Sequence, residues 1–201
     1  MNEILIVVGV TASAFIGTNM DNFLLLVTMY SRYFRHPGTV AAGYFTGMVL
    51  IAAITIAIGK LGDFIPVKYL GLLGIIPMMM GVIAFWKLFR RPQADELDGT
   101  FAGNSGLAIF SALVTIQLSN GTDTIITFST LYADSSNPTD FIVAPAFFAM
   151  VGVFAWAAYY SVRHPGIGRF LARYGKYVTP FILILVGFYI FTDTASDLVP
   201  G

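Results

Sequence analysis

Two short polar segments interrupt long apolar stretches and carry the side chains best suited to bind an ion. They read TNMDN at residues 18–22 and NGTD at residues 120–123, so Asp21 and Asp123 each lie close to an asparagine. A carboxylate in the hydrocarbon layer costs roughly 2.5–3.5 kcal/mol on insertion scales, and such acids usually face an interior cavity that serves an ion or a proton. The two segments therefore predict an ion site inside a membrane protein.

We expect these segments to supply a single midplane site. Two neighbouring carboxylates repel each other unless a divalent cation or a proton neutralises them. The predicted metal ligands are Asn19, Asp21, Asn22, Asn120 and Asp123. The hydroxyl-bearing residues predicted to line the substrate pathway are Thr18, Thr28, Thr124, Thr127 and Thr130.

The backbone around the acids is expected to depart from a regular helix. The apolar spans that carry them, 4–31 and 106–133, would each be about 42 Å long as helices, longer than the roughly 30 Å hydrocarbon core. Gly17 and Gly121 beside the polar residues predict local unwinding, which would expose carbonyl groups to a cation. Asn19 and Asp21 are two positions apart and would face nearly opposite directions on an unbroken helix.

The second polar segment has the spacing of one helical face. Asn120, Asp123, Thr127 and Thr130 are separated by three, four and three positions. Residues at this spacing lie on one side of an α-helix. We expect the resulting stripe of oxygen atoms to point into the bundle.

The composition is that of an integral membrane protein. Hydrophobic residues make up 57% and charged residues 11% of the 201 residues, and the mean hydropathy is +0.78. A soluble domain has about a quarter charged residues. The absence of cysteine excludes disulfides and thiolate metal sites, and a net charge of zero argues against nucleic acid as a partner.

Six apolar runs predict an all-α membrane protein with six transmembrane helices in a single domain, residues 1–201. The runs cover residues 4–31, 39–59, 69–89, 106–133, 141–162 and 178–195. Continuous apolar runs of this length indicate helices, because a barrel strand would alternate and needs only about 10 residues. The apolar N-terminal run lacks the basic residues of a signal peptide, so we expect it to be retained as the first span.

The chain carries traces of an inverted repeat, with one half at 1–91, a cytoplasmic loop at 92–105 and the second half at 106–201. Three spans per half would return the second half in the opposite orientation. Asp21, Thr28 and Tyr30 recur 102 positions later as Asp123, Thr130 and Tyr132. Phe45, Met48 and Val49 recur at the same offset as Phe147, Met150 and Val151.

The two polar segments and the run LGLLGIIP at 70–77 resemble the cadmium resistance transporter family of the lysine-exporter superfamily. The family pattern has a second acid where this chain has Asn22, and an asparagine where it has Thr124. The resemblance covers essentially the whole chain. It implies a secondary transporter that exports a divalent cation through a bundle of two inverted halves, with Asn19, Asp21, Asn120 and Asp123 at the site.

Other functions are consistent with parts of the pattern. An amino acid exporter of the same superfamily is the nearest alternative, and an intramembrane aspartyl protease also needs two helix-borne acids, although its usual motifs are missing here. A noncatalytic membrane subunit is a third class. We expect no enzymatic activity and no cofactor, with the metal as transported substrate and lipid as the surroundings.

Two further features bear on the energy source of transport and on the oligomeric state. It has no nucleotide-binding loop, so we expect an antiporter in which protons acting on the same carboxylates drive export. Gly43 and Gly47 form a GxxxG pair in the second span, which predicts either a homodimer face or close packing within the chain.

The basic residues predict the orientation in the cell (inner) membrane. Nine of the eleven lysines and arginines follow spans one, three and five, which makes those ends cytoplasmic and both termini extracytoplasmic. A reporter fused to the C-terminus should therefore read outside, and a label in the loop at 92–100 should read inside. A C-terminal reporter in the cytoplasm would contradict the six-span topology.

Overall fold

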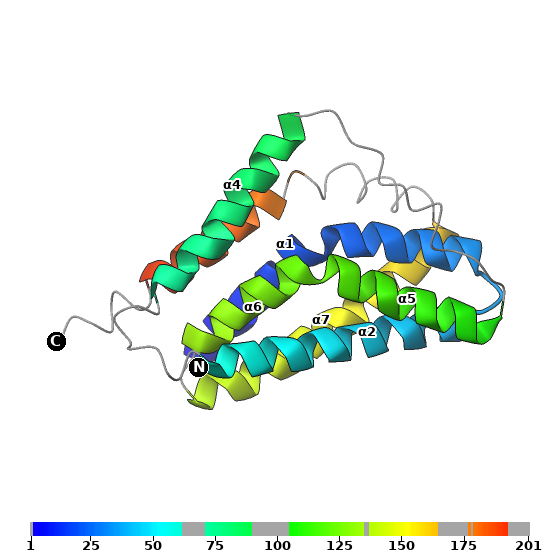
Figure 1. Ribbon diagram of the computed structural model, residues 1–201, viewed down its shortest axis with the longest axis horizontal. Helices are drawn as coiled ribbons and strands as arrows, with labels where there is room; N and C mark the ends of the chain where they lie inside the picture. Colours follow the sequence, from blue (N-terminus) through cyan, green and yellow to red (C-terminus); the bar gives the residue numbers. More distant parts are fainter. Residues whose placement is uncertain are drawn as a thin grey trace.

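The computed structural model describes residues 2–61, 71–89, 105–134, 137–164, 177 and 179–192 (Figure 1). All secondary structure within these residues is helical. The elements are α1 (Asn2–Arg32), α2 (Pro37–Gly59), a 3₁₀ turn η2 (Gly71–Gly74) leading into α4 (Ile75–Phe89), α5 (Gly106–Asn120), α6 (Thr122–Asp134) and α7 (Asn137–Arg163). One more helix, Thr179–Thr192, is orange to red in Figure 1.

The helices coincide with the six predicted apolar runs, and three of them are long enough to cross a membrane. These three segments are Ile4–Arg32, Pro37–Gly59 and Phe141–Arg163. The segments Leu72–Trp86, Gly106–Asn120 and Thr179–Thr192 are apolar but shorter. The chain is thus an all-helical membrane protein. The predicted cytoplasmic loop lies outside the described residues, apart from Ser105 at its end.

Local sequence explains where the helices begin. Pro37 opens α2, where its fixed φ suits the first turn and its missing N–H has no role. Ser105 precedes α5, and its hydroxyl accepts a hydrogen bond from the Ala108 N–H at 3.2 Å. This N-cap satisfies one of the free donors of the first turn.

Helices α1 and α7 run parallel and are joined by aromatic contacts. The ring centroids of Phe15 and Phe147 are 5.1 Å apart, those of Phe23 and Phe154 5.5 Å, and those of Tyr30 and Tyr159 5.5 Å. The contacts advance along both helices in the same direction. The C-terminal ends of α1 and α7, each with an arginine in its last turn, therefore lie at the same end of the molecule.

Helix α2 runs parallel to α5 and α6 at very close range. A Cβ added to Gly43 would lie 2.7 Å from the Leu113 Cβ, and one added to Gly47 would lie 2.5 Å from the Gln117 Cβ. Further along, the Ser129 hydroxyl donates to the Thr55 carbonyl at 3.3 Å. The GxxxG pair is therefore buried inside the chain, and its interpretation as a dimer face is wrong. Together α1, α2, α5, α6 and α7 form what we call the body.

Helix α4 and helix Thr179–Thr192 form a separate antiparallel pair, which we call the peripheral pair. A Cβ on Gly74 would lie 2.4 Å from the Gly187 carbonyl oxygen, and a Cβ on Gly187 would lie 2.4 Å from that of Gly74. At the other end of the pair, the rings of Phe85 and Phe181 are 6.0 Å apart. In Figure 1 the peripheral pair lies along one side of the body, above α1 and α6.

The close approach of α2 and α5 predicts that Gly43 tolerates no side chain. An added methyl group at Gly43 would also meet the Phe110 carbonyl oxygen at 2.9 Å, and this backbone atom cannot rotate away. Gly43→Ala should lower the free energy of unfolding by about 1–3 kcal/mol. Thermal unfolding of the detergent-purified protein measures this.

The matched control is Gly152→Ala in α7, where nothing lies within 4 Å of the added Cβ. This variant should be unchanged or more stable, because alanine favours a helix over glycine. Equal melting temperatures for the two variants would show that α2 and α5 are not packed at this distance.

Candidate functional site

The first polar segment lies within an unbroken helix. α1 extends over 31 residues from Asn2 to Arg32, so the predicted unwinding at Gly17 is wrong. Gly17 instead allows the peripheral pair to approach, because a Cβ there would lie 2.8 Å from the Ile182 Cγ2. As expected for an unbroken helix, Asn19 is fully buried while Asp21 is exposed.

The buried side of this segment forms a directed chain of hydrogen bonds. The Asn19 Nδ2 donates to the Phe15 carbonyl at 3.1 Å and to the Thr18 Oγ1 at 2.9 Å. The Asn22 Nδ2 donates to the Asn19 Oδ1 at 3.0 Å. Thr18 in turn donates to the Ala14 carbonyl at 3.0 Å. We call Thr18, Asn19 and Asn22 the amide relay.

The second polar segment does break, at the glycine predicted from the sequence. α5 ends at Asn120, Gly121 forms a turn with φ −78° and ψ 0°, and α6 begins at Thr122. Packing accounts for the glycine, since a Cβ there would lie 2.5 Å from the Ile51 Cδ1.

The predicted stripe of oxygen atoms does not form a single interior face. Asn120 and Asp123 are exposed, whereas Thr127 and Thr130 are buried. The 3, 4, 3 spacing assumes a continuous helix, and the turn at Gly121 separates Asn120 from the rest. The buried residue of this segment is Thr124, one position after the acid.

Helical spacing relates both aspartates to residues that face the peripheral pair. Asp21 is one turn along α1 from Gly17, which contacts Ile182, and residues four apart share a helix face. Asp123 is three positions before Ile126, which lines a cavity together with Leu73 and Ile76 at the start of the pair. Neither aspartate is without an interaction partner.

The predicted five-ligand set is thus divided between two locations. Asp21, Asn120 and Asp123 are exposed on the body, whereas Asn19 and Asn22 are buried, with Asn19 on the opposite face of α1 from Asp21. Within the described residues, no three His, Cys, Asp or Glu side chains come together as a ready-made metal cluster. A metal site at Asp21 and Asp123 would therefore have to take its ligands from both α1 and α6, or be completed by other oxygen ligands or water.

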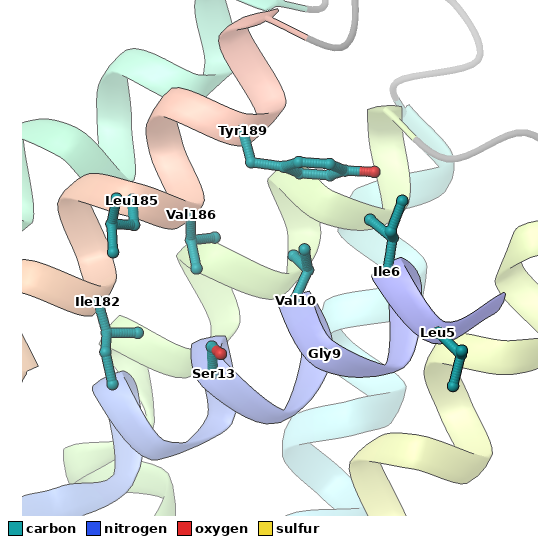
Figure 2. A pocket seen from close by; sticks show the side chains of 9 residues that line it. All are labelled: Leu5, Ile6, Gly9, Val10, Ser13, Ile182, Leu185, Val186 and Tyr189. Carbon is teal, nitrogen blue, oxygen red and sulfur yellow. The ribbon is translucent and has the colours of Figure 1, made fainter. Parts of the chain in front are cut away.

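The boundary between the body and the peripheral pair contains two apolar cavities. One, of about 290 Å³, lies between α1 and helix Thr179–Thr192 (Figure 2). In this view Tyr189 extends from the peripheral pair toward Ile6 of α1, and Ser13 is the polar residue on the α1 side. The other, of about 280 Å³, lies where α6 and the end of α2 face η2 and α4. The boundary thus combines these cavities with close contacts, such as that of Gly17 with Ile182.

The threonines predicted to line the pathway have different roles. The Thr28 hydroxyl donates to the Leu24 carbonyl at 2.9 Å and that of Thr130 to the Thr127 carbonyl at 2.7 Å, as is common for threonine in helices. The Thr124 and Thr127 hydroxyls are fully buried and have no hydrogen-bond partner among the described residues.

Sequence reasoning missed four other buried polar side chains. They are Thr11 of α1, Tyr44 and Thr55 of α2 and Gln117 of α5, each with polar atoms that lack a partner in the described part of the chain. Gln117 is fully buried although glutamine is rarely so. Its position four residues before Gly121, within an apolar span, was the available signal.

Comparison with known proteins identifies a family for the chain. No curated protein and no solved structure matches it. The model of a family described as cadmium resistance transporter matches residues 15–198. This match includes both polar segments, the peripheral pair and the body except for the first part of α1. The chain therefore belongs to the cadmium resistance transporter family, which is a family of transporters and not of enzymes.

Proposed function

We propose that this protein exports a divalent metal cation, cadmium or a similar ion, with Asp21 and Asp123 as its principal ligands. The family match over residues 15–198 is the observation that carries the proposal. Carboxylate oxygens neutralise a divalent cation, and intramembrane acids commonly mark ion pathways. Asn120, which is exposed like Asp123, is an additional proposed oxygen ligand.

The positions of the two acids support a shared role. Asp21 in α1 and Asp123 in α6 are 102 positions apart, and helical spacing relates both to residues that face the peripheral pair. The contacts between the helices are consistent with such a relation, because α1 pairs with α7 from the second half while α5 and α6 pair with α2 from the first. These crossed pairs favour two inverted repeats, a design in which ion sites form where the repeats meet.

The cavities beside the peripheral pair suggest how access alternates. The peripheral pair is held together by the reciprocal contact of Gly74 and Gly187, while its boundary with the body contains two apolar cavities. In our proposal the pair rocks against the body and opens the acids first to the cytoplasm and then to the outside. Arg32 and Arg163 at one end of the body favour that end as cytoplasmic.

Protons are the proposed coupling ion at the acids. Once the metal leaves, two carboxylates in a poorly hydrated region repel each other and gain affinity for a proton. Proton uptake from outside would then return the empty carrier without an uncompensated buried charge. This gives a cation–proton antiporter of the cell membrane.

Removing either acid should abolish export without unfolding the protein. Asp21→Asn and Asp123→Asn keep the side-chain size but remove the charge that binds the metal. Cadmium efflux should be lost while the melting temperature is held or raised, because the repulsion between two carboxylates without a metal is removed. Metal accumulation in everted vesicles measures transport.

Glu3→Gln is the control for the acids, since it also removes one acidic charge but lies near the N-terminus. It should transport normally. Normal efflux by both Asp21→Asn and Asp123→Asn would exclude the proposed site.

The rocking of the peripheral pair can be tested by cross-linking, since the chain has no cysteine of its own. Ser13 and Val186 line the same cavity from opposite sides of the boundary (Figure 2). A Ser13→Cys, Val186→Cys variant treated with a short bifunctional thiol reagent should stop transporting. Cleavage of the linker should restore transport.

The control is a link inside the peripheral pair. Phe85 and Phe181 are in contact within it, so the Phe85→Cys, Phe181→Cys variant should transport equally well with and without the reagent. Undiminished transport by the cross-linked Ser13–Val186 variant would mean that this boundary does not move during export.

A further inference from the structure

The cavity between α1 and helix Thr179–Thr192 is a slot that closes at its deep end (Figure 2). It begins beside Leu5 in the first turns of α1 and continues to Ser13, about 12 Å further along the helix. Beyond Ser13 the two helices touch, because a Cβ on Gly17 would lie 2.8 Å from the Ile182 Cγ2. We call this cavity the lateral slot.

The side of the lateral slot opens toward the surroundings of the protein. Leu5, Ile6 and Leu185 at its rim are 67%, 51% and 65% exposed, whereas Val186 inside it is only 3% exposed. Both helices are apolar segments of a membrane protein. In a bilayer the opening therefore faces hydrocarbon and not water.

The lining of the lateral slot favours an apolar occupant. Apart from Ser13 and Tyr189, the residues that line it are aliphatic or glycine. A water molecule needs several polar partners, so an apolar cavity of this kind stays dry. Left empty, the walls would lose dispersion contacts over a volume of about 290 Å³, which approaches the roughly 300–1,000 Å³ of pockets that bind small molecules.

Tyr189 indicates which end of the slot lies near the membrane surface. In Figure 2 its ring extends across the slot toward Ile6, which is close to the start of the membrane-spanning segment Ile4–Arg32. Tyrosine favours this level of a bilayer, because its ring is apolar and its hydroxyl seeks polar surroundings. A lipid that enters here has its head group beside Tyr189 and its chain directed toward Ser13.

We propose that the lateral slot binds one acyl chain of a bilayer phospholipid, from the leaflet at the N-terminal end of α1. The depth of the slot, about 12 Å, fits within the roughly 15 Å that one leaflet contributes to the hydrocarbon core. Its open rim is continuous with the lipid-facing side of α1, so a chain enters without leaving hydrocarbon. The site is separate from the acids, and the inference does not rest on the proposed export function.

A chain in the slot supplies packing that the two helices do not make with each other. Helices in a membrane associate through close packing, because lipid tails are as apolar as their side chains. The chain would contact Val10 of α1 on one side and Val186 of the peripheral pair on the other. The lipid thus becomes part of the boundary between the body and the peripheral pair.

Photo-labelling in phosphatidylcholine nanodiscs tests the proposal. Two probes are used, each a phosphatidylcholine with a diazirine in one acyl chain, placed either near the glycerol or near the chain end. After irradiation, mass spectrometry of peptides locates the label. The probe with the diazirine near the glycerol should label Ile6 and Tyr189, and the probe with the diazirine near the chain end should label Ser13 and Val186.

Filling the slot with a side chain provides a variant for the same measurement. Gly9 lines the slot, and nothing lies within 4 Å of a Cβ added there. Gly9→Leu should therefore fold, with a melting temperature held or raised, and labelling of Val186 should fall several-fold. Gly152→Leu in α7 also has open space around the added Cβ but is not part of the slot, so it should keep full labelling of Val186.

Labelling of Val49, which is exposed on α2, reports ordinary contact with bilayer lipid and should be equal in all three proteins. Undiminished labelling of Val186 in Gly9→Leu would overturn the proposal, as would a reversed order of depth for the two probes. Val186 left unlabelled by both probes would also overturn it and would favour a second copy of the chain as the cover of the slot. The depth order is measured on the unmodified protein, so the test does not depend on the variant.

Discussion

The structure depends on one constraint, which is that a polar group inside a bilayer must find its partner within the protein. Helices meet this demand for the backbone, and the described secondary structure is entirely helical. The amide relay meets it for side chains, since each donor from Thr18 to Asn22 is satisfied within its own helix. Among the described residues the demand is not met at several buried side-chain atoms, which belong to Thr11, Asn22, Tyr44, Thr55, Gln117, Thr124 and Thr127. Ion sites are expected where buried polar atoms have no partner within the protein and can instead be coordinated by a reversibly bound ion.

Packing divides the molecule into parts with different freedom to move. Glycines bring α2 against α5 and α4 against helix Thr179–Thr192 at distances that allow no side chain between them. The boundary between the body and the peripheral pair is instead lined by large aliphatic residues around cavities. Helical spacing relates Asp21 and Asp123 to residues that face the peripheral pair, whereas the side chains of the amide relay are buried.

Much of the fold could be predicted because apolar length alone identifies membrane helices. Helical spacing predicted that Asn19 and Asp21 lie on opposite sides of an unbroken α1. The glycine beside the second acid predicted the break at Gly121. It failed where tertiary contacts decide the outcome. Gly17 has the same local context as Gly121, yet it serves a close approach of Ile182 and leaves the helix intact. The interior stripe required a continuous helix through Gly121, and the role of Gly43 and Gly47 depended on a partner helix that is remote in sequence.

The exchange of partners between the halves affects how such a protein can be made. α1 leaves the ribosome first, but the aromatic residues that cover Phe15 and Phe23 belong to α7, more than 120 positions later. Until α7 is synthesised, α1 must remain in the membrane with part of its packing surface facing lipid. The hydrogen bonds of the amide relay allow this, because the Asn19 Nδ2 donates to the Phe15 carbonyl and to the Thr18 hydroxyl, both within α1. The first helix can therefore be inserted early and wait, while the body closes only when most of the chain has been translated.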